Sequence, residues 1–539
     1  MKQYVKLSVV FFVCSTLFGQ QIPVQSDHSV YSYLYRQSTS GILPQWVQST
    51  KPLTLEQVLN LLTQVIETSE IGNANRALAE RFKSEFSIPI KPGTHLPFSK
   101  SNRINHLLSY ESADIEPHLL ALKHENSSLW LDWNETLVLA SSNDYERYFQ
   151  DKFTLKTKIN DQVSAYSQFS MNRLVWNNET LAIESVLPPD TINWVTYYNE
   201  WAKYFPEVNW IFWYNTRAGI SIIFDQIQFD LGKQNHSWGW SPSHSPILSG
   251  TGQPFAFIGL QTNISKIRFK FLHGSLMPFT PYEVHRRKIT PNKYIAAHRG
   301  EIDITNNFTL SITEMVIYGN RNMDFDYLIP LHWYWAGEHN RGDQDNLLIG
   351  LDYSWRIRSG LRIYQTLLWD ELTWNKILDP WWGNKFVFQS GLHWVPASNP
   401  LIPDLRIEYT ISRPWVYTHE DTTNTFSSMD MGLGFPYGPS AQVLRITTNL
   451  FPTTRILING TVELVSKGSG LGSSVLHNYD FRDTTLDNNT PLLVAPVYDK
   501  SVITLSIKYD LSRYLKLHSD YIYSSSDGNQ IRVGMIWDW

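Results

Sequence analysis

The last residues of the chain read Ile531-Arg532-Val533-Gly534-Met535-Ile536-Trp537-Asp538-Trp539. Every second side chain of this stretch is apolar, and Arg532, Gly534 and Asp538 lie between the apolar ones. Successive side chains of a strand point to opposite faces, so a period of two predicts a β-strand with one apolar face. Taken alone, the stretch also fits an edge strand that ends a soluble sheet.

The order of residue types here resembles the C-terminal signal of bacterial outer-membrane β-barrels. Arg532 is polar, Gly534 follows two positions later, and aromatic residues stand at Trp537 and Trp539. In such barrels one strand face meets lipid, the other faces the lumen, and aromatic residues collect at the membrane–water boundary. The resemblance implies that these four residues form an insertion signal read by the barrel-assembly machinery. It also implies that Trp537 and Trp539 mark one rim, while Arg532 and Asp538 face the lumen.

Residues 1–20 have the organisation of a secretory signal peptide. Lys2 and Lys6 precede an apolar run at 7–17, and Gly19 lies near the expected cleavage site. We therefore predict that the chain is exported and that this segment is removed. Cys14 is the only cysteine of the chain, so the mature protein is expected to have no disulfide bond and no thiolate metal site.

Composition narrows the class of protein further. No later stretch has about eighteen consecutive apolar residues, which excludes a helical membrane protein. Aromatic residues make up 14% of the 539 residues, which suits aromatic girdles, carbohydrate stacking or both. The net charge of -5 is small for this length and gives no support to nucleic-acid binding, which requires a basic face.

Residues 21–105 are predicted to form a helical region. Thr54 begins a capping box with Gln57, and an apolar stripe with spacings of three and four follows it. Further helical patterns lie near 30–35 and 74–86. Because these apolar stripes need a surface to pack against, we expect either a periplasmic bundle or a plug on the end of a barrel.

From about Ser128 to the end, the sequence shows the period of two along runs that are long enough to cross a bilayer, and we assign residues 106–539 to the barrel. Between 347 and 357 the odd-numbered residues are apolar, and Asp352 and Arg356 lie on the opposite face. A tilted membrane strand needs about ten residues, and this region has room for about eighteen strands with their connections. The sequence thus predicts an all-β transmembrane barrel of about 18 antiparallel strands with a small N-terminal α-helical bundle.

One segment departs from the strand pattern. Trp194, Tyr197, Tyr198, Trp201 and Phe205 have helical spacing, which predicts a short amphipathic helix within a connection. This helix either offers an aromatic platform to sugars or simply packs against the barrel.

Charged residues also occur inside the predicted strands. Glu314 interrupts the apolar parity of its run, which predicts a β-bulge that turns this carboxylate inward. His298, Arg299, Glu301 and Asp303 on the preceding strand are its expected partners, because an ionisable group at membrane depth must face the lumen. This lumen polar network either rigidifies the barrel through salt bridges or lines a space that holds a hydrated polymer.

The sequence has no recognisable enzyme signature. It contains no nucleophile elbow, no zinc-protease motif and no P-loop. Asp370 and Glu371 are adjacent in a predicted strand and should therefore point to opposite faces. His332, His339 and Asp343 lie in a stretch rich in glycine and charge, which is typical of a solvated loop. We predict no enzymatic activity, no metal site and no cofactor.

Several runs, taken in order, resemble the Wzi capsule-assembly family of outer-membrane proteins. They include SWGWSP at 237–242, SPILS at 245–249, HRGEID at 298–303, LSITEMVIYG at 310–319, DNLLIGLD at 345–352, LLWDE at 367–371, RIEYT at 406–410 and GPS at 438–440. The resemblance covers nearly the whole mature chain. It implies a barrel of about eighteen strands with a periplasmic helical bundle, and a non-enzymatic role in binding surface polysaccharide and attaching or organising a capsule.

Three functions follow as hypotheses. The first is an outer-membrane protein that binds capsular polysaccharide or exopolysaccharide, with outer-membrane lipid as a second partner. Aromatic rings stack on sugars, and charged or amide side chains bind hydroxyls or acidic groups. The candidate residues are Trp238, Trp240, Arg341, Asp343, Asp345, Asn346, Trp381 and Trp382. The second hypothesis is a porin-like channel or exporter, and the third is a hydrolase of glycans or lipids.

Overall fold

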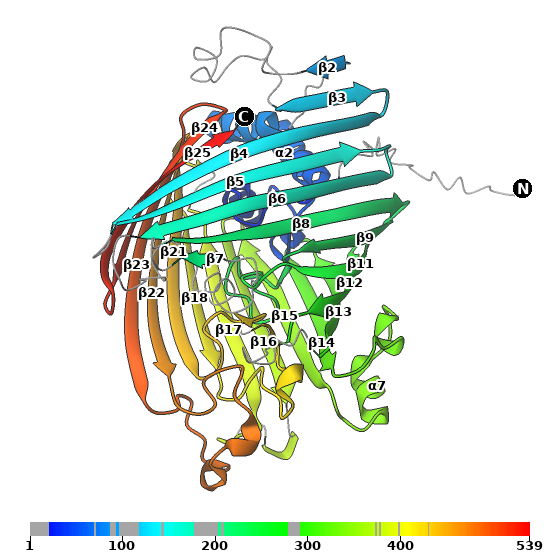
Figure 1. Ribbon diagram of the computed structural model, residues 1–539, viewed down its shortest axis with the longest axis vertical. Helices are drawn as coiled ribbons and strands as arrows, with labels where there is room; N and C mark the ends of the chain where they lie inside the picture. Colours follow the sequence, from blue (N-terminus) through cyan, green and yellow to red (C-terminus); the bar gives the residue numbers. More distant parts are fainter. Residues whose placement is uncertain are drawn as a thin grey trace, which may run out of the picture.

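The computed structural model describes residues 21–68, 72–86, 93–95, 118–141, 145–176, 203–205, 210–278, 291–371, 374–376, 379–396, 399–429 and 431–538. Within them, 18 antiparallel strands close into a barrel, which confirms the predicted fold class (Figure 1). The strands are β4 (Ser127–Ser141), β5 (Tyr145–Lys158), β6 (Val163–Trp176), β8 (Trp210–Phe224), β9 (Ile227–Gln234), β11 (Phe255–Ile264), β12 (Ile267–Leu276), β13 (Lys293–Thr305), β14 (Phe308–Gly319), β15 (Asn346–Arg358), β16 (Leu361–Glu371), β17 (Lys385–Trp394), β18 (Leu405–Ser412), β21 (Ala441–Thr453), β22 (Ile456–Gly468), β23 (Val497–Asp510), β24 (Leu515–Ser524) and β25 (Gly528–Asp538).

The C-terminal strand closes the barrel. β25 pairs with β24 on one side and with β4 on the other, in a ladder from Ile531 opposite Ser141 to Asp538 opposite Asn134. Ile531 and Val533 are exposed on the outer face, as the period of two predicts. Trp539 lies outside the described residues.

The two ends of the barrel differ in the length of their connections. At one end, tight turns such as 225–226, 265–266 and 359–360 join the strands; at the other, long connections at 320–345, 413–440 and 469–496 do so. We call these the short-turn end and the long-loop end. In outer-membrane barrels the short turns face the periplasm and the longer loops face outward.

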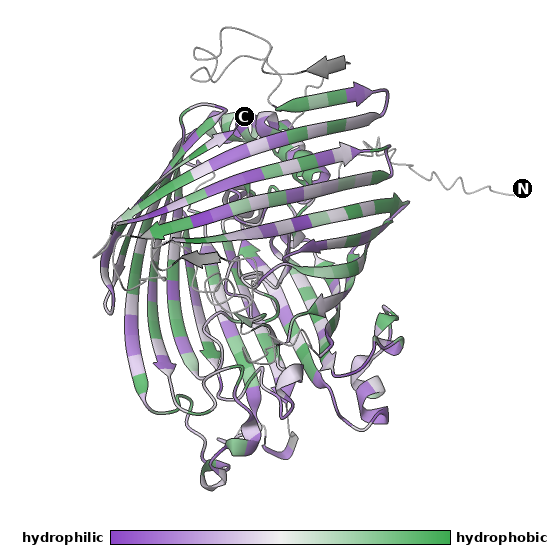
Figure 2. Ribbon diagram, in the orientation of Figure 1, coloured by the Kyte–Doolittle hydropathy of each residue, from purple (hydrophilic) through white to green (hydrophobic). Residues whose placement is uncertain are grey.

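The side chains divide by parity along the strands. On β15, Leu351 and Trp355 are 41% and 44% exposed on the outer surface, whereas the alternate residues Asp352 and Ser354 are buried. The same alternation of apolar and polar residues runs along other strands (Figure 2). An outer apolar face and an inner polar face are the arrangement that a membrane barrel requires.

Helices close the short-turn end. The N-terminal helices are α1 (Val30–Ser40), α2 (Leu55–Glu67) and α3 (Asn73–Phe86), and the predicted capping box between Thr54 and Gln57 is present. Their apolar faces share one hydrophobic core with Phe451 and Leu457 of the barrel. Arg36 of α1 donates to the backbone oxygens of Asn399 and Ile402 at the short-turn end, so the helices plug the barrel rather than standing apart from it. No helix among the described residues is long and apolar enough to cross a membrane.

Two long connections fold back into the lumen. Residues 235–254 and 413–440 contribute buried apolar side chains to a core that also contains inward residues of the wall, such as Met315 and Leu348. Inside the barrel, the plug meets the first of these connections: β1 (Thr50–Lys51) pairs with β10 (Ser237–Trp238). The described part of the lumen is therefore filled from both ends.

Two local predictions need comment. The helix predicted from Trp194 to Phe205 falls mostly outside the described residues, and its described end, β7 (Lys203–Phe205), is a short strand paired with β8. The β-bulge predicted at Glu314 is wrong, because the β13–β14 ladder runs without a register shift from Lys293 opposite Gly319 to Asp303 opposite Thr309.

Candidate functional site

Trp238 and Trp240 lie in the in-folded connection at 235–254 and are buried. They are 3% and 0% exposed. Trp238 belongs to the lumen core, and the Arg362 guanidinium lies 5.3 Å from the centroid of the Trp240 ring. These rings pack the connection into the barrel and are not presented to a polymer outside.

The candidates Arg341, Asp343, Asp345 and Asn346 lie at the end of the 320–345 connection. Asp345 is buried and accepts two hydrogen bonds from Arg321, at 2.7 and 2.6 Å, and one from the Tyr327 hydroxyl at 2.8 Å. Arg341 pairs with Asp324 and Asp326, and Asn346 is buried at the start of β15. Most of these polar groups therefore hold the connection itself together, and of the four candidates Arg341 and Asp343 are exposed.

Glu338 is an ionisable residue of this connection that sequence reasoning missed. It lies in α7 (Tyr334–Asn340), and burial, reinforced by Asp343 and Asp345, raises the pKa of its carboxyl to about 8. Ligand atoms of Glu338, His339 and Asp343 lie within 4.8 Å of one another, whereas His332 is not part of this group. His339 and Asp343 are exposed, as predicted, but the predicted solvated loop is wrong in part, because His339 belongs to α7 and Glu338 and Asp345 are buried.

Trp381 and Trp382 come together with residues from a distant connection. The Arg482 guanidinium lies 3.8 Å from the centroid of the Trp382 ring, and Tyr479 packs against the same ring at a centroid distance of 5.5 Å. Trp381 lies beside Trp382 at a centroid distance of 5.8 Å, and Phe481, which precedes Arg482 in the sequence, is 75% exposed. We call Trp381, Trp382, Tyr479, Phe481 and Arg482 the aromatic patch.

Lysine side chains lie beneath the aromatic patch. The Lys385 ammonium is 4.0 Å from the centroid of the Tyr479 ring and 5.0 Å from that of Trp382. Lys376 is 4.8 Å from the centroid of Trp381. Partly exposed rings with cations beside them provide both stacking surfaces and donors for hydroxyl or acidic groups.

The connection at 413–440 ties the other long connections into one surface. Asn320 donates to Asp421 at 2.6 Å, and Asn424 donates to the backbone oxygen of Gln344 at 3.0 Å. On its other side, Asn478 donates to the backbone oxygen of Glu420 at 2.8 Å. These hydrogen bonds therefore join the described parts of the connections at 320–345, 413–440 and 469–496 to one another.

Three members of the predicted lumen network do meet inside the barrel. Arg299 donates to Glu301 at 2.8 Å and, through two nitrogens, to Asp352 at 2.7 Å. Arg268 bridges Glu301 at 2.9 Å and Asp303 at 2.7 Å. These charges satisfy one another across neighbouring strands, which is the geometry of a network that rigidifies the wall.

His298 and Glu314 lie on the opposite face of the wall. They share parity with the outward-facing Ile302 and Ile312, and α7 covers them from outside. Glu314 accepts from the backbone N–H groups of Tyr334 and Trp335, at 3.0 and 2.7 Å, and pairs with His298 at 3.1 Å. The expectation that Glu314 turns inward is therefore wrong: this carboxylate caps a helix that packs on the outer surface.

Asp370 and Glu371 do not form a catalytic pair. Asp370 accepts from the backbone N–H of Tyr417 in the in-folded connection, whereas Glu371 pairs with Lys385 at 2.6 Å. The two carboxylates engage separate partners, as their adjacency in a strand predicts.

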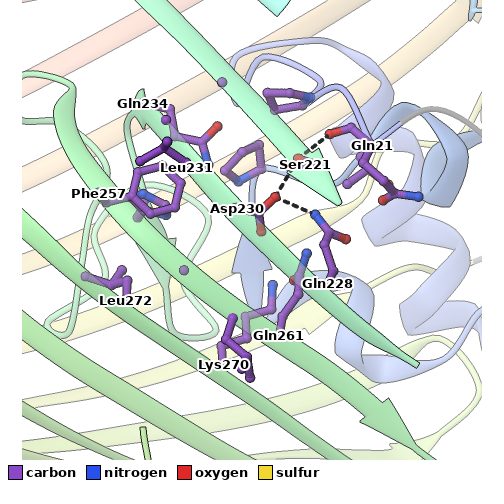
Figure 3. A pocket seen from close by; sticks show the side chains of 18 of the residues that line it. Gln21, Ser221, Gln228, Asp230, Leu231, Gln234, Phe257, Gln261, Lys270 and Leu272 are labelled. Atoms are coloured by element: carbon purple, nitrogen blue, oxygen red, sulfur yellow. Dashed lines mark hydrogen bonds between the residues drawn. The ribbon is translucent and has the colours of Figure 1, made fainter. Parts of the chain in front are cut away.

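A small polar cavity of about 70 Å³ lies where the plug meets β8, β9, β11 and β12 (Figure 3). Ser221 and Gln228 both donate to Asp230, at 2.5 and 2.8 Å. Lys270 donates to Thr50 of the plug at 2.6 Å. The hydrogen bond between Lys270 and Thr50 joins the plug to the wall.

Comparisons with known proteins identify the fold. No family model and no curated protein matches the chain. Among solved structures, the chain is similar to Wzi of Escherichia coli, which is described as an outer membrane protein involved in group 1 capsule assembly and as a carbohydrate-binding β-barrel. The two sequences are 11% identical, the match covers 96% of this chain and 99% of Wzi, and the TM-score is 0.58. The chain is also similar to OprD of Pseudomonas aeruginosa, with 9% identity, 77% of this chain and 95% of OprD covered, and a TM-score of 0.39. A further similar structure is OccAB4 of Acinetobacter baumannii, with 9% identity, 77% of this chain and 98% of OccAB4 covered, and a TM-score of 0.41. The chain thus has the Wzi-type fold, a closed β-barrel with N-terminal helices.

Proposed function

We propose that the protein lies in the bacterial outer membrane and binds surface polysaccharide at its long-loop end, where it helps to attach or assemble a capsule or exopolysaccharide layer. The observation that carries this proposal is the aromatic patch, a set of partly exposed rings underlain by cations at the outward-facing end. The similarity to Wzi, a carbohydrate-binding barrel, supports it.

The patch suits a chain of sugars. Trp381 and Phe481 offer apolar ring faces to sugar C–H groups, and the half-buried Arg482 offers a charged donor to hydroxyls or carboxylates. The exposed carboxylate of Asp343, on a neighbouring connection, adds an acceptor for sugar hydroxyls. Of the residues expected to bind polymer, we retain Trp381, Trp382, Arg341 and Asp343, and we give Trp238 and Trp240 a packing role.

The filled lumen favours a binder over a channel or exporter. The pairing of Thr50 and Lys51 with Ser237 and Trp238 places two connections across the described interior. A porin-like channel needs a continuous aqueous path, so we expect the purified protein to be nearly silent in a planar lipid bilayer. Steady conductance would favour the channel instead.

We propose a non-enzymatic role. Asp370 and Glu371 engage separate partners and lack the shared space that paired carboxylates need for glycoside hydrolysis. A hydrolase acting on glycans or lipids would turn over purified capsule or lipopolysaccharide, and the Asp370→Asn variant would lose that turnover. We expect no turnover by either protein.

The route to the membrane is part of the proposal. Residues 1–20 act as a cleaved signal peptide, 21–105 as the helical region that plugs the short-turn end and 106–539 as the barrel. Arg532, Gly534, Trp537 and Trp539 supply the insertion signal to the barrel-assembly machinery, and the outer apolar face meets lipid. No partner among nucleic acids is expected.

Deletion of the gene tests the function in the cell. We expect polysaccharide to appear in the medium while its total synthesis is unchanged, and re-expression of the protein to restore the cell-bound fraction. If the cell-bound fraction stays the same after deletion, polysaccharide attachment is not the function.

A further inference from the structure

A cavity of about 280 Å³ lies inside the barrel, away from the aromatic patch. Residues 26–29 and Tyr35 of the plug form one side, and Pro242 and Ser243 of the in-folded connection form another. The remaining wall consists of inward residues of β17, β18 and β21–β23. A volume of this size accommodates a small organic molecule rather than isolated waters alone.

Two buried hydroxyl groups that line the cavity have no hydrogen-bond partner among the described residues. They are the hydroxyls of Tyr35 and Thr447, whose residues are 4% and 8% exposed. Buried polar groups in folded proteins are nearly always hydrogen-bonded, and an exception calls for water or a ligand. These two hydroxyls therefore leave unused hydrogen-bonding capacity at the cavity wall.

Three cations at the cavity form no direct ion pair with a carboxylate among the described residues. Arg406 donates to Tyr364 and Gln48 and contacts His393, at 3.3, 3.4 and 3.3 Å, and Glu408 and Asp404 attract it without a direct ion pair. Lys51 donates only to backbone oxygens, that of Pro242 at 2.6 Å and that of Ser26 at 3.5 Å. Lys508 is exposed in the cavity and forms no ion pair there.

The acidic residues of the cavity do not balance these cations. Asp404 is already paired with Arg36 at 3.3 Å, and Arg445 is already paired with Glu463 at 2.8 Å. Asp27 is the remaining lining carboxylate among the described residues. Asp27 attracts Lys51 and Lys508, and Glu408, which does not line the cavity, attracts Arg406. The three cations still outnumber these two carboxylates, which favours a ligand that carries a negative charge.

We propose that this cavity binds one acidic sugar residue, with its carboxylate among Lys51, Arg406 and Lys508 and its hydroxyls directed to Tyr35 and Thr447. The choice of a sugar rests on the polysaccharide-binding function proposed above. Lys508 lies two positions before the end of β23 at the short-turn end, and Asp27 precedes α1, so the cavity lies toward the plug side. The site is thus separate from the outward-facing patch.

Calorimetric titration of the purified full-length protein in detergent tests the proposal, with sodium glucuronate, glucose and inorganic phosphate as probes. We expect glucuronate to bind and glucose and phosphate to bind at least tenfold more weakly. Lys508→Gln and Lys51→Met should each weaken glucuronate binding about tenfold, and Tyr35→Phe severalfold. Lys500→Gln is the matched control, because Lys500 lies on the same strand but pairs with Asp527 near the long-loop end. It should bind like the wild type.

Migration on unheated and heated gels verifies that each variant is folded. The proposal is overturned if glucuronate does not bind, if glucose or phosphate binds equally well, or if folded Lys508→Gln and Tyr35→Phe both bind like the wild type. Failure of the proposed function is a different result: in that case patch variants leave polymer binding unchanged while glucuronate still binds in a Lys508-dependent way.

Discussion

The Arg482 guanidinium lies 3.8 Å from the centre of the Trp382 ring, although the two residues belong to different connections of the barrel. Asp487 completes the junction: it accepts from Arg482 at 3.0 and 3.2 Å, and its backbone oxygen accepts from the backbone N–H of Trp382 at 2.8 Å. This junction locks the connections at 372–384 and 469–496 together and positions the aromatic patch.

Arg482→Ala should loosen that junction. A cation–π contact of this kind contributes about 0.5–2 kcal/mol, so we expect polysaccharide affinity to fall about threefold to tenfold and protease cleavage within 469–496 to accelerate. Surface plasmon resonance and timed proteolysis measure the two effects. Arg358→Ala, an exposed arginine at the short-turn end, is the control. If both variants have the same polysaccharide affinity and the same cleavage rate, Arg482 does not position the aromatic patch.

Glu314→Ala should release α7 from the outer surface of the barrel. The substitution removes the acceptor for the N–H groups of Tyr334 and Trp335 and the partner of His298, a loss of about 1–2 kcal/mol. We expect faster amide exchange over Tyr334–Asn340 while the exchange of β13 and β14 stays slow. Asp527→Ala is the control. Unchanged exchange in α7 would show that other contacts hold this helix.

The connection at 320–345 should loosen as the pH rises. The pKa of Glu338 is raised to about 8 by burial and by Asp343 and Asp345. Because the raised pKa means that the folded connection favours the protonated carboxyl, protonation of Glu338 stabilises the folded connection. This stabilisation is complete below pH 4.5, the ordinary pKa of the group, and it is lost as the pH rises through about 8.

Limited proteolysis at pH 6 and pH 9 measures this effect. We expect cleavage within 320–345 to accelerate on the order of tenfold in the wild type after correction for the protease's own pH profile. Glu338→Gln should abolish the dependence, because it mimics the protonated carboxyl at both pH values. A wild type whose cleavage does not change with pH contradicts the assigned environment of Glu338.

Gly239→Ala should disturb the lumen filling. Gly239 has a φ of +114°, and an added Cβ would collide with the Ser245 hydroxyl, so we expect a cost of about 1–3 kcal/mol. The connection at 235–254 should then leave the lumen transiently, and these movements should appear as brief conductance events in planar-bilayer recordings. Gly432→Ala is the control, because nothing lies within 4 Å of its added Cβ. Identical recordings from both variants would mean that this connection does not seal the lumen.

The sequence predicts those parts of the structure that depend on local patterns. The capping box at Thr54, the helices of the plug and the strands with a period of two are all short-range signals. The wrong prediction of a β-bulge at Glu314 has a physical cause: both faces of β14 are covered by segments that lie elsewhere in the sequence. Met315 and Ile317 pack inward on the in-folded connections, while Val316 and Tyr318 pack outward under α7, so the apolar residues on both faces imitate a change of parity.

The candidate site shows the same limit. Nothing in the sequence around Trp382 points to Arg482, which belongs to a distant connection, and nothing marks Trp240 as buried rather than exposed. Contacts such as that between Trp382 and Arg482 depend on which connections fold into the lumen and which lie across the long-loop end. Tyr35 and Thr447 also meet only because the plug occupies the lumen.

The most direct test of the central claim is the binding of capsular polysaccharide, purified from the bacterium that encodes this chain, to the purified protein. The comparison is among the wild type, the Trp381→Ala/Phe481→Ala double variant, and Trp394→Ala, which removes an exposed tryptophan at the short-turn end. We predict that the double variant binds at least about tenfold more weakly and that Trp394→Ala binds like the wild type. Equal binding by all three proteins, or no binding by the wild type, would contradict the claim.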